Sequence, residues 1–286
     1  MPRSSYDYPG YDRSGPVYWF KTISLYAGVI FGVLWMVAPF YWTVTTALSA
    51  NPSSGIVTII PETVTFEHFR ALFAEYPVQR WFINAFIFAG AVTLFNVTFD
   101  TLAGYAFAKL DFFAREKIFL LFIGTMMIPG MVTLIPVYII LSELGWVNTY
   151  RGLIAPLIAS PFGIFLLRQY FKSLPSSLGD AARIDGCNKF QAFYHIYLPL
   201  AKPAVATLGI FAFMGAWNNF EWPLIIATSN DMYTLPVALF LVQGQYTDNW
   251  GLVMAAAAIM VIPIIIAFLS AQQYFIRGMT LSGVKG

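Results

Sequence analysis

Six long apolar stretches constrain the fold of this chain more than any other feature of its sequence. A helix that crosses a lipid bilayer needs about 20 predominantly apolar residues, and each stretch is long enough. The stretches cover residues 21–48, 81–108, 118–141, 152–171, 201–228 and 251–275. We therefore predict an all-α integral membrane protein with six transmembrane helices.

The composition excludes an ordinary soluble protein. Hydrophobic residues make up 58% of the 286 residues and charged residues only 10%, whereas soluble domains carry about 25% charged residues. A single soluble core of this length could not bury so much apolar surface. The formal net charge of +2 is too small to indicate nucleic-acid binding. The one cysteine, Cys187, cannot form an intrachain disulfide.

Several prolines lie inside the predicted spans. Proline interrupts soluble helices, but membrane helices tolerate it because neighbouring groups satisfy the freed backbone. We expect kinks, in helices that must open and close, at Pro39, Pro129, Pro136, Pro156, Pro161, Pro223 and Pro263.

The distribution of Lys and Arg predicts the orientation, because cytoplasmic loops carry an excess of these residues. With the N-terminus in the cytoplasm, only three of the 16 Lys and Arg residues lie outside, namely Arg70, Arg80 and Arg151. Both termini are therefore predicted to be cytoplasmic. Residues 1–20 are polar and are predicted to form a flexible tail. Residues 21–286 are predicted to form one domain with a core at about 80–275.

The cytoplasmic loop at residues 173–199 does not fit a simple bundle of spans. Pro175 would end the preceding helix. Ser177 and Asp180 have the spacing of a capping box at the start of a new helix, and Gly186 suits its C-terminal end. We therefore predict a helix–turn–helix that projects from the membrane.

This projection has features that suit contact with another protein. A slim face that a partner surface could approach would be formed by Ala181, Ala182 and Ile184. A second amphipathic stretch follows, which ends at Leu198-Pro199 and has apolar residues at helical spacing at Phe190, Phe193 and Ile196. The charges that could pair with a partner are Asp180, Arg183, Asp185 and Lys189. An interfacial loop without a partner explains the same residues, and the residues alone leave both interpretations open.

The loop also carries an ordered motif. Asp180-Ala181-Ala182 is followed after three residues by Gly186, and nine residues later come Ile196, Leu198 and Pro199. This pattern resembles the Glu-Ala-Ala, three residues, Gly, nine residues, Ile, any residue, Leu-Pro motif of binding-protein-dependent ABC permeases. Asp replaces Glu at position 180, which keeps the charge and shortens its reach. The resemblance implies the type I importer permease fold, also called MetI-like.

Two further segments resemble the carbohydrate branch of this family, in particular the second, smaller permease of maltose-type transporters. The fifth span contains the run Trp217-Asn-Asn-Phe-Glu-Trp-Pro-Leu224, and residues 273–286 form a similar C-terminal ending. The resemblance covers about residue 81 to the end of the chain.

The resemblance implies a set of partners. They are a second permease subunit that completes the pore as a heterodimer, two ATPase subunits and an extracytoplasmic solute-binding protein. ATP and Mg would bind to the ATPase subunits. This chain would bind no cofactor and catalyse no reaction, and it has no Gly-x4-Gly-Lys-Ser/Thr phosphate loop. The location implied is a bacterial-type plasma (inner) membrane, which the chain crosses several times.

By the same resemblance, the loop at residues 173–199 would be the coupling helix that docks in a cleft of the ATPase. The residues implied in this coupling are Asp180, Ala181, Ala182, Arg183, Asp185, Gly186, Ile196, Leu198 and Pro199. The tail after residue 275 would also contact the ATPase dimer through Arg277 and Lys285, unless it is a disordered end.

Candidate contacts with a sugar lie in the fifth span. Aromatic, amide and carboxylate side chains bind sugars, and this run supplies Trp217, Asn218, Asn219 and Glu221. Glu221 is an ionisable group near the end of a span, which indicates a functional role. A gate or a packing motif would use the same residues. Asp100, in the second span, either has a function or pairs with another helix.

Two other regions complete the sequence-based expectations. The outer loop at residues 229–250 would face the binding protein or would simply be solvated. His68 and His195 have no partners at metal-ligand spacing, so no metal site is predicted.

Three rival functions explain the sequence less well. A secondary transporter would use intramembrane charges as an ion path, and only Asp100 and Glu221 qualify. A membrane enzyme would need paired carboxylates, histidine clusters or an activated nucleophile, and none is evident near a span. An ABC importer for a polyol, a glycerol phosphate or a peptide stays open, because the companion permease could supply most contacts with the solute.

Overall fold

A computed structural model describes residues 16–50, 52, 60–61, 63–245 and 249–282 of the chain. Every regular element within these ranges is a helix. Two of the helices are continuous and both long and apolar enough to cross a membrane: α1 (Pro16–Ala47) and α3 (Val78–Lys109). Residues 16–20, which were expected in the flexible tail, are therefore helical, and residues 1–15 lie outside the described ranges.

Three further pairs of helices have the length and composition of a span, but each is bent at a short break. The α4 helix (Arg115–Thr125) meets α5 (Gly130–Glu143) at 96°. The α6 helix (Tyr150–Ile154) with η1 (Ala155–Leu157) meets α7 (Pro161–Ser173) at 41°. Counted by length and composition, the described residues thus hold two spans, or up to five if each bent pair is one span.

The third bent pair joins the loop at residues 173–199 to the predicted fifth span. The α9 helix (Lys189–Ala192), η2 (Phe193–Tyr197) and α10 (Leu198–Leu200) together meet α11 (Lys202–Trp217) at 78°. The remaining helices are α2 (Glu67–Glu75), α8 (Ser177–Ile184), α12 (Glu221–Ile226), α13 (Leu235–Gln245) and α14 (Trp250–Ser282). The predicted sixth span lies within α14.

Proline lies at the start of the second helix in each of the three bent pairs, and in the third pair it is Pro203, the second residue of α11. Pro129 immediately precedes α5, and Pro161 is the first residue of α7. Proline has no N–H group and is pre-organised for the first turn of a helix, so a new helix starts at these positions in a new direction. The kinks predicted at Pro129 and Pro161 are therefore confirmed.

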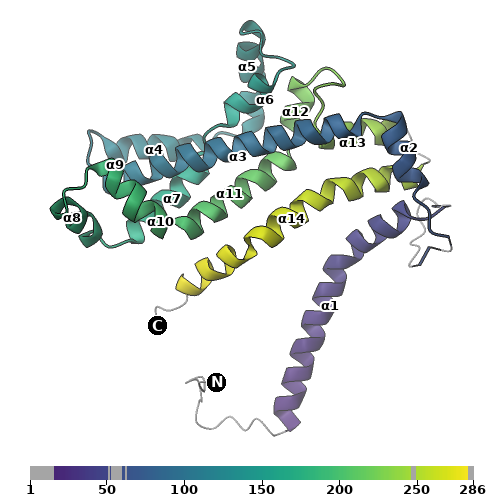
Figure 1. Cartoon of the computed structure of the whole chain (residues 1–286), viewed down its shortest axis with the longest axis horizontal. Helices are drawn as coiled ribbons and strands as arrows, with labels where there is room; N and C mark the ends of the chain where they lie inside the picture. The colour runs from purple at the N-terminus through teal and green to yellow at the C-terminus, as the bar shows by residue number, and fades with distance from the viewer. Residues whose placement is uncertain (1–15, 51, 53–59, 62, 246–248, 283–286) are drawn as a thin grey trace.

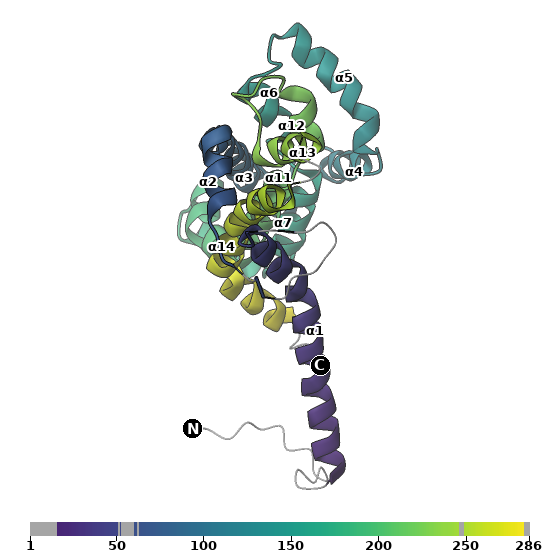
Figure 2. The same ribbon diagram turned by 90° about the vertical axis from the view of Figure 1, so that its right-hand side faces the viewer.

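The helices are arranged around α3, which runs along the length of the molecule (Figure 1). The α7 and α11 helices pack along α3, and α14 crosses beside α11. The α8 and α9 helices lie at one end of α3, and α2 lies at the other end (Figure 1). The α1 helix packs on α14 near α2 and then diverges from the other helices (Figure 2). Its apolar side chains are largely exposed, as expected of a surface that faces lipid or another subunit.

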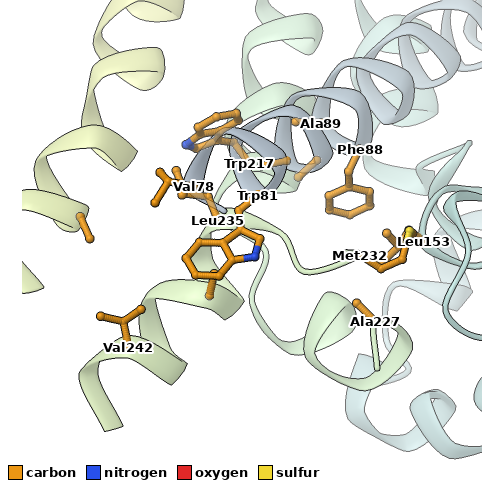
Figure 3. Packing of buried hydrophobic residues seen from close by; sticks show 14 of the residues in the cluster. Val78, Trp81, Phe88, Ala89, Leu153, Trp217, Ala227, Met232, Leu235 and Val242 are labelled. Atoms are coloured by element: carbon orange, nitrogen blue, oxygen red, sulfur yellow. The ribbon is translucent and has the colours of Figure 1, made fainter. Parts of the chain in front are cut away.

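Two buried clusters hold the helices together. The larger lies near α2 and contains Trp81, Phe88, Leu153, Trp217 and Leu235, which come from α3, α6, α11 and α13 (Figure 3). The second lies at the opposite end of α3, where it joins this helix to the loop at residues 173–199. Its members include Tyr105, Leu167, Phe171, Phe193 and Tyr197.

A buried arginine joins three helices near the second cluster. Arg168 of α7 donates a hydrogen bond of 2.6 Å from Nη2 to Glu116 Oε2 of α4, and one of 3.3 Å from Nε to the carbonyl oxygen of Phe107. Its guanidinium group lies 3.7 Å from the centre of the Phe119 ring.

Candidate functional site

The first helix of the projecting loop, α8, begins without the predicted cap. Ser177 is its first helical residue, and Ser176 before it has helical backbone angles and caps no N–H group. A capping box needs an N-cap residue with non-helical angles. The predicted box of Ser177 and Asp180 is therefore wrong, although α8 itself forms where it was expected.

The turn after α8 is built as predicted. Gly186 has a φ of +80°, a left-handed conformation that glycine adopts without the steric cost of a Cβ atom. Its N–H group donates to the carbonyl oxygen of Arg183 at 3.1 Å, and the N–H of Cys187 donates to that of Ala182 at 2.9 Å. These two bonds define a Schellman motif, and the predicted stop at Gly186 is confirmed.

The second half of the loop carries a capping box that the sequence analysis missed. Asn188 Oδ1 accepts from the N–H of Gln191 at 2.8 Å, and Gln191 Oε1 accepts from the N–H of Asn188 at 2.9 Å. The sequence does contain the pattern that indicates this capping box, because Asn188 and Gln191 are three residues apart and follow shortly after Gly186. The helix ends at Leu200 and breaks at Ala201, immediately before α11. Its end thus lies one residue beyond the predicted Leu198-Pro199, just before the fifth span as expected.

One face of the loop is bound to its own chain. Ala182 is only 1% exposed and packs with Ala192, Phe193 and Tyr197 against α3 and α7. The prediction that Ala181, Ala182 and Ile184 share one outer face is therefore wrong for Ala182. The reason is the helical period of about 100° per residue, which turns residue 182 away from residue 184.

The opposite face of the loop is open. Ile184 is 86% exposed, Phe190 68% and Tyr194 59%. The side chains of Asp180, Ala181, Arg183 and Asp185 are exposed on the same projection, as is Pro199, whereas Ile196 and Leu198 are half-buried. A polar segment thus presents large apolar side chains together with both signs of charge, which is the composition of a protein-binding surface.

The loop is seated on the end of α3 by polar contacts. Tyr105 Oη donates to the carbonyl oxygen of Lys189 at 3.0 Å, and Lys109 Nζ donates to that of Leu174 at 2.7 Å. Lys109 Nζ also lies 5.3 Å from the centre of the Tyr197 ring. The Tyr197 hydroxyl group meets α8 at Gly179, where a Cβ atom would lie 2.7 Å from Tyr197 Oη.

We expect Gly179→Ala to displace α8 from this seat, at a cost of about 1–3 kcal/mol for overpacking. Tyr197→Phe should rescue this variant, because only the hydroxyl oxygen is close and Tyr197 Cζ is 3.9 Å from the added Cβ. Thermal unfolding of the purified single and double variants measures both effects. Equal unfolding of Gly179→Ala with and without Tyr197→Phe would contradict this contact.

The four candidate solute residues lie around the break between α11 and α12 but differ in exposure. Trp217 is 1% exposed, and its Nε1 donates to the carbonyl oxygen of Met260 in α14 at 3.1 Å. Asn219 Oδ1 accepts from the N–H of Trp222 at 3.2 Å. Asn218 and Glu221 are exposed. Trp217 therefore packs in the core of this conformation, whereas Asn218 and Glu221 are accessible from outside it.

The segment that follows α12 is held by amide side chains of α3 and of the turn between α5 and α6. Asn84 of α3 is fully buried and donates from Nδ2 to the carbonyl oxygens of Asp231 at 2.7 Å and Tyr233 at 2.9 Å. Asn148 Oδ1 accepts from the N–H groups of Thr228 and Ser229. The sequence analysis missed both residues, although a buried amide within a span, such as Asn84, indicates a structural or functional role.

The other candidates are dispersed. Arg277 belongs to α14, but its side chain is outside the described part, and Lys285 and residues 246–248 of the outer loop lie outside the described ranges. One ring nitrogen of His68 contacts the carbonyl oxygen of Ser49 at 2.9 Å. Among the described residues, no three His, Cys, Asp or Glu side chains are grouped to hold a metal ion.

The fold is shared with a solved chain of a membrane transporter. The chain is similar to a solved chain of a bacterial ABC transporter involved in the import of the acidic polysaccharide alginate, with a TM-score of 0.78 and 23% identity over 93% of this chain and 99% of that one. Residues 100–281 match the family of binding-protein-dependent transport system inner membrane components. The chain belongs to this family.

Curated relatives extend the similarity over most of the chain. The arabinooligosaccharides transport system permease protein AraQ of Halalkalibacterium halodurans is 39% identical over 82% of this chain and 84% of its own length. The trehalose/maltose transport system permease protein MalG of Thermococcus litoralis is 31% identical over 93% of this chain and 98% of its own length. The resemblance drawn from the loop motif and from the fifth-span run is thus confirmed.

Proposed function

We propose that the chain is one of two permease subunits of an ATP-driven importer, which moves a sugar or an oligosaccharide delivered by an extracytoplasmic binding protein. The arabinooligosaccharide and trehalose/maltose permeases among its relatives support this solute class. The companions are a second permease, two ATPase subunits and the binding protein. ATP and Mg bind to the ATPases, and this chain contributes the path through the membrane.

The membrane arrangement follows from the charge distribution. Six spans with both termini in the cytoplasm leave only Arg70, Arg80 and Arg151 of the Lys and Arg residues outside. In this orientation the end of α3 that carries α8 and α9 faces the cytoplasm, and the end near α2 faces outward. The bent pairs α4–α5 and α6–α7 then count as the third and fourth spans.

The observation that carries the proposal is the exposed apolar surface of Ile184, Phe190 and Tyr194 on a polar projection. Such side chains are stabilised by burial against a partner, at about 25 cal/mol per Å2 of apolar area. Here the partner is a cleft of the ATPase subunit, and Asp180, Arg183 and Asp185 pair with charges at its rim.

The coupling mechanism is a rigid displacement. When ATP binding draws the two ATPases together, the docked loop moves with them, and its seat on Tyr105 and Lys109 passes the motion to α3 and α7. The spans then alternate between inward-open and outward-open arrangements. Arg277 and Lys285 of the tail provide a second contact with the ATPases.

The solute contacts are proposed at the break between α11 and α12. Asn218 and Glu221 provide an amide and a carboxylate for sugar hydroxyl groups, and Trp217 supports them through its packing against Phe82, whose ring centre is 5.6 Å away. The segment at residues 229–250 was expected to be a loop, but it contains α13, which packs into the larger buried cluster. The part of this segment before α13 faces the binding protein. The amide side chains of Asn84 and Asn148 hold this part in place.

The test uses a cysteine on the open face of the loop. In a Cys187→Ser background, Ile184→Cys is expressed in the native membrane with a tagged chain and treated with a short thiol crosslinker. We expect a crosslink to an ATPase subunit whose yield changes when ATP is added. Glu75→Cys, which is exposed on α2 at the other end of the molecule, is the matched control and should not crosslink to the ATPase.

The co-purifying proteins decide between this proposal and its rivals. A second permease, an ATPase and a solute-binding protein are expected, and the sugar specificity of that binding protein then identifies the solute. Recovery of the chain alone, together with solute movement in vesicles without ATP, would instead establish a secondary transporter.

A further inference from the structure

A break in the backbone lies between η1 and α7, at residues 158–160. A break within a span leaves backbone N–H and carbonyl groups without their helical partners, and each unsatisfied group in hydrocarbon costs several kcal/mol. Pro161 cannot continue the preceding hydrogen-bond pattern because it has no N–H group. Another helix must therefore supply the missing partners.

Two polar side chains of α3 supply them. Asn96 Nδ2 donates to the carbonyl oxygen of Leu157, the last residue of η1, at 2.6 Å. Asp100 Oδ1 accepts from the N–H of Ser160, the residue that precedes α7, at 3.0 Å. Asn96 is 5% exposed and Asp100 is 0% exposed. They are four residues apart, so they lie on one face of α3, one turn from each other.

The Asp100 carboxylate is closely packed against Gly163 of α7. A Cβ atom at Gly163 would overlap with Asp100 Oδ2, and it would lie 2.9 Å from Leu208 Cδ1. Asp100 Oδ2 has no hydrogen-bond partner among the described residues. The carboxylate therefore accepts one hydrogen bond among the described residues, through Oδ1 from the N–H of Ser160. It can approach this N–H group because the residue of α7 that it contacts, Gly163, has no side chain.

The other end of α7 is also held by α3. Lys109 Nζ donates to the carbonyl oxygen of Leu174, which is the residue after α7. The α7 helix leads directly into α8 through residues 174–176. A displacement of the projecting loop therefore reaches α7 first. The direction in which α7 moves depends on its attachments to α3, which include the contacts at its two ends and the hydrogen bond from Arg168 to the carbonyl oxygen of Phe107.

We propose that Asn96 and Asp100 form a clamp on the break in the fourth span and that Asp100 is a positioning residue for transport. Asp100 fixes the start of α7 relative to α3 by accepting the Ser160 hydrogen bond. Without this bond, α7 would pivot at residues 158–160. A displacement of the projecting loop would then rotate α7 about this break and would no longer move α3. The effect on transport rests on the proposed function, whereas the clamp itself does not.

The experiment compares three variants of the full chain, purified with the partners that accompany it. Asp100→Leu keeps the branched shape and the number of heavy atoms of the side chain but accepts no hydrogen bond. Asp100→Asn keeps an oxygen that can take the place of Oδ1. Thr98→Val is the matched control, because the Thr98 hydroxyl group donates to the carbonyl oxygen of Leu94 within α3 and, among the described residues, to no other helix. Hydrogen exchange of the Ser160 amide is followed by mass spectrometry of peptides that cover residues 158–164.

We expect exchange at Ser160 to rise about tenfold in Asp100→Leu, as for loss of a buried hydrogen bond, and to stay near the wild-type rate in Asp100→Asn and Thr98→Val. Unchanged exchange in Asp100→Leu, or equal exchange in the Leu and Asn variants, would overturn the clamp. If Asp100→Leu does not assemble, Asn96→Leu removes the other half of the clamp and should raise exchange over residues 158–164. Unchanged exchange there would also overturn it.

The functional arm uses labelled arabinotriose, maltose and trehalose as probes in proteoliposomes that contain the binding protein. For a probe that the wild-type complex accumulates, the amount transported per ATP hydrolysed should fall about tenfold in Asp100→Leu and recover in Asp100→Asn. If exchange rises but this ratio does not change, Asp100 has no role in transport and that part of the proposal fails. If no ATPase accompanies the chain, the proposed function fails, while the exchange measurement still tests the clamp.

Discussion

Replacement of Gly186 by valine is expected to abolish uptake while the chain remains in the membrane. Gly186 has a φ of +80° and makes the turn between α8 and α9. A β-branched residue at positive φ is strained, and non-glycine residues in such conformations cost about 1–3 kcal/mol. No atom of the described part of the chain lies within 4 Å of a Cβ atom at this position, so the strain is confined to the backbone. The turn should open, and the exposed surface of the loop should then no longer match the ATPase.

A second variant at the same position separates backbone strain from side-chain bulk. Asn tolerates the left-handed conformation better than other non-glycine residues, so Gly186→Asn should retain most of the uptake. Uptake in membrane vesicles and recovery of the ATPase with the tagged chain measure the two variants. Normal uptake with Gly186→Val would refute the docking of this turn against the ATPase.

Replacement of Gly104 by alanine is expected to destabilise the protein by about 1–3 kcal/mol, the usual cost of overpacking. The α3 and α7 helices approach closely at this residue, where a Cβ atom would lie 2.6 Å from Leu167 Cβ and 3.0 Å from the backbone nitrogen of Arg168. A backbone atom cannot rotate away as a side chain does. The two helices must therefore separate, which also strains the ion pair of Arg168 with Glu116.

The same substitution elsewhere in α3 should not destabilise the protein. Gly90 is in this helix, but nothing lies within 4 Å of a Cβ atom there. Glycine within a helix is about 0.5–1 kcal/mol less favourable than alanine, so Gly90→Ala should be neutral or stabilising. Thermal unfolding of the two purified variants in detergent gives the comparison. A Gly104→Ala protein as stable as Gly90→Ala would show that the close approach of α3 and α7 is not required.

Some features could be predicted because local chemistry decides them. The apolar stretches correspond to α1, α3, the bent pairs α4–α5 and α6–α7, the helices α11 and α12, and α14, since burial of a helical backbone in lipid requires long apolar segments. Gly186 ends α8 because its turn involves only backbone groups that are close in the chain, namely the N–H groups of Gly186 and Cys187 and the carbonyl oxygens of the last turn of α8. Pro129 and Pro161 begin new helices for the same local reason.

Other features depend on which helices meet. The sequence placed Trp217 among possible solute contacts, but the position of α14 buries its ring and provides an acceptor for its indole N–H group. Ala182 was expected to face a partner, and it instead packs against Tyr197 of its own loop. The exposure of a side chain depends on which helix packs next to it, and the pattern of residues along the chain does not show which helix that will be.

The sequence by itself determined the apolar segments, the projecting loop, its motif and the turn at Gly186, because each depends on residues close together in the chain. Only the tertiary structure decided the exposure of Ile184, the burial of Trp217 and the pairing of Asn96 and Asp100 with the break before α7. The physical reason is that a buried polar group must find a hydrogen-bond partner. Asp100 finds its partner 60 residues along the chain, and only the packing of α3 against α7 brings the two together.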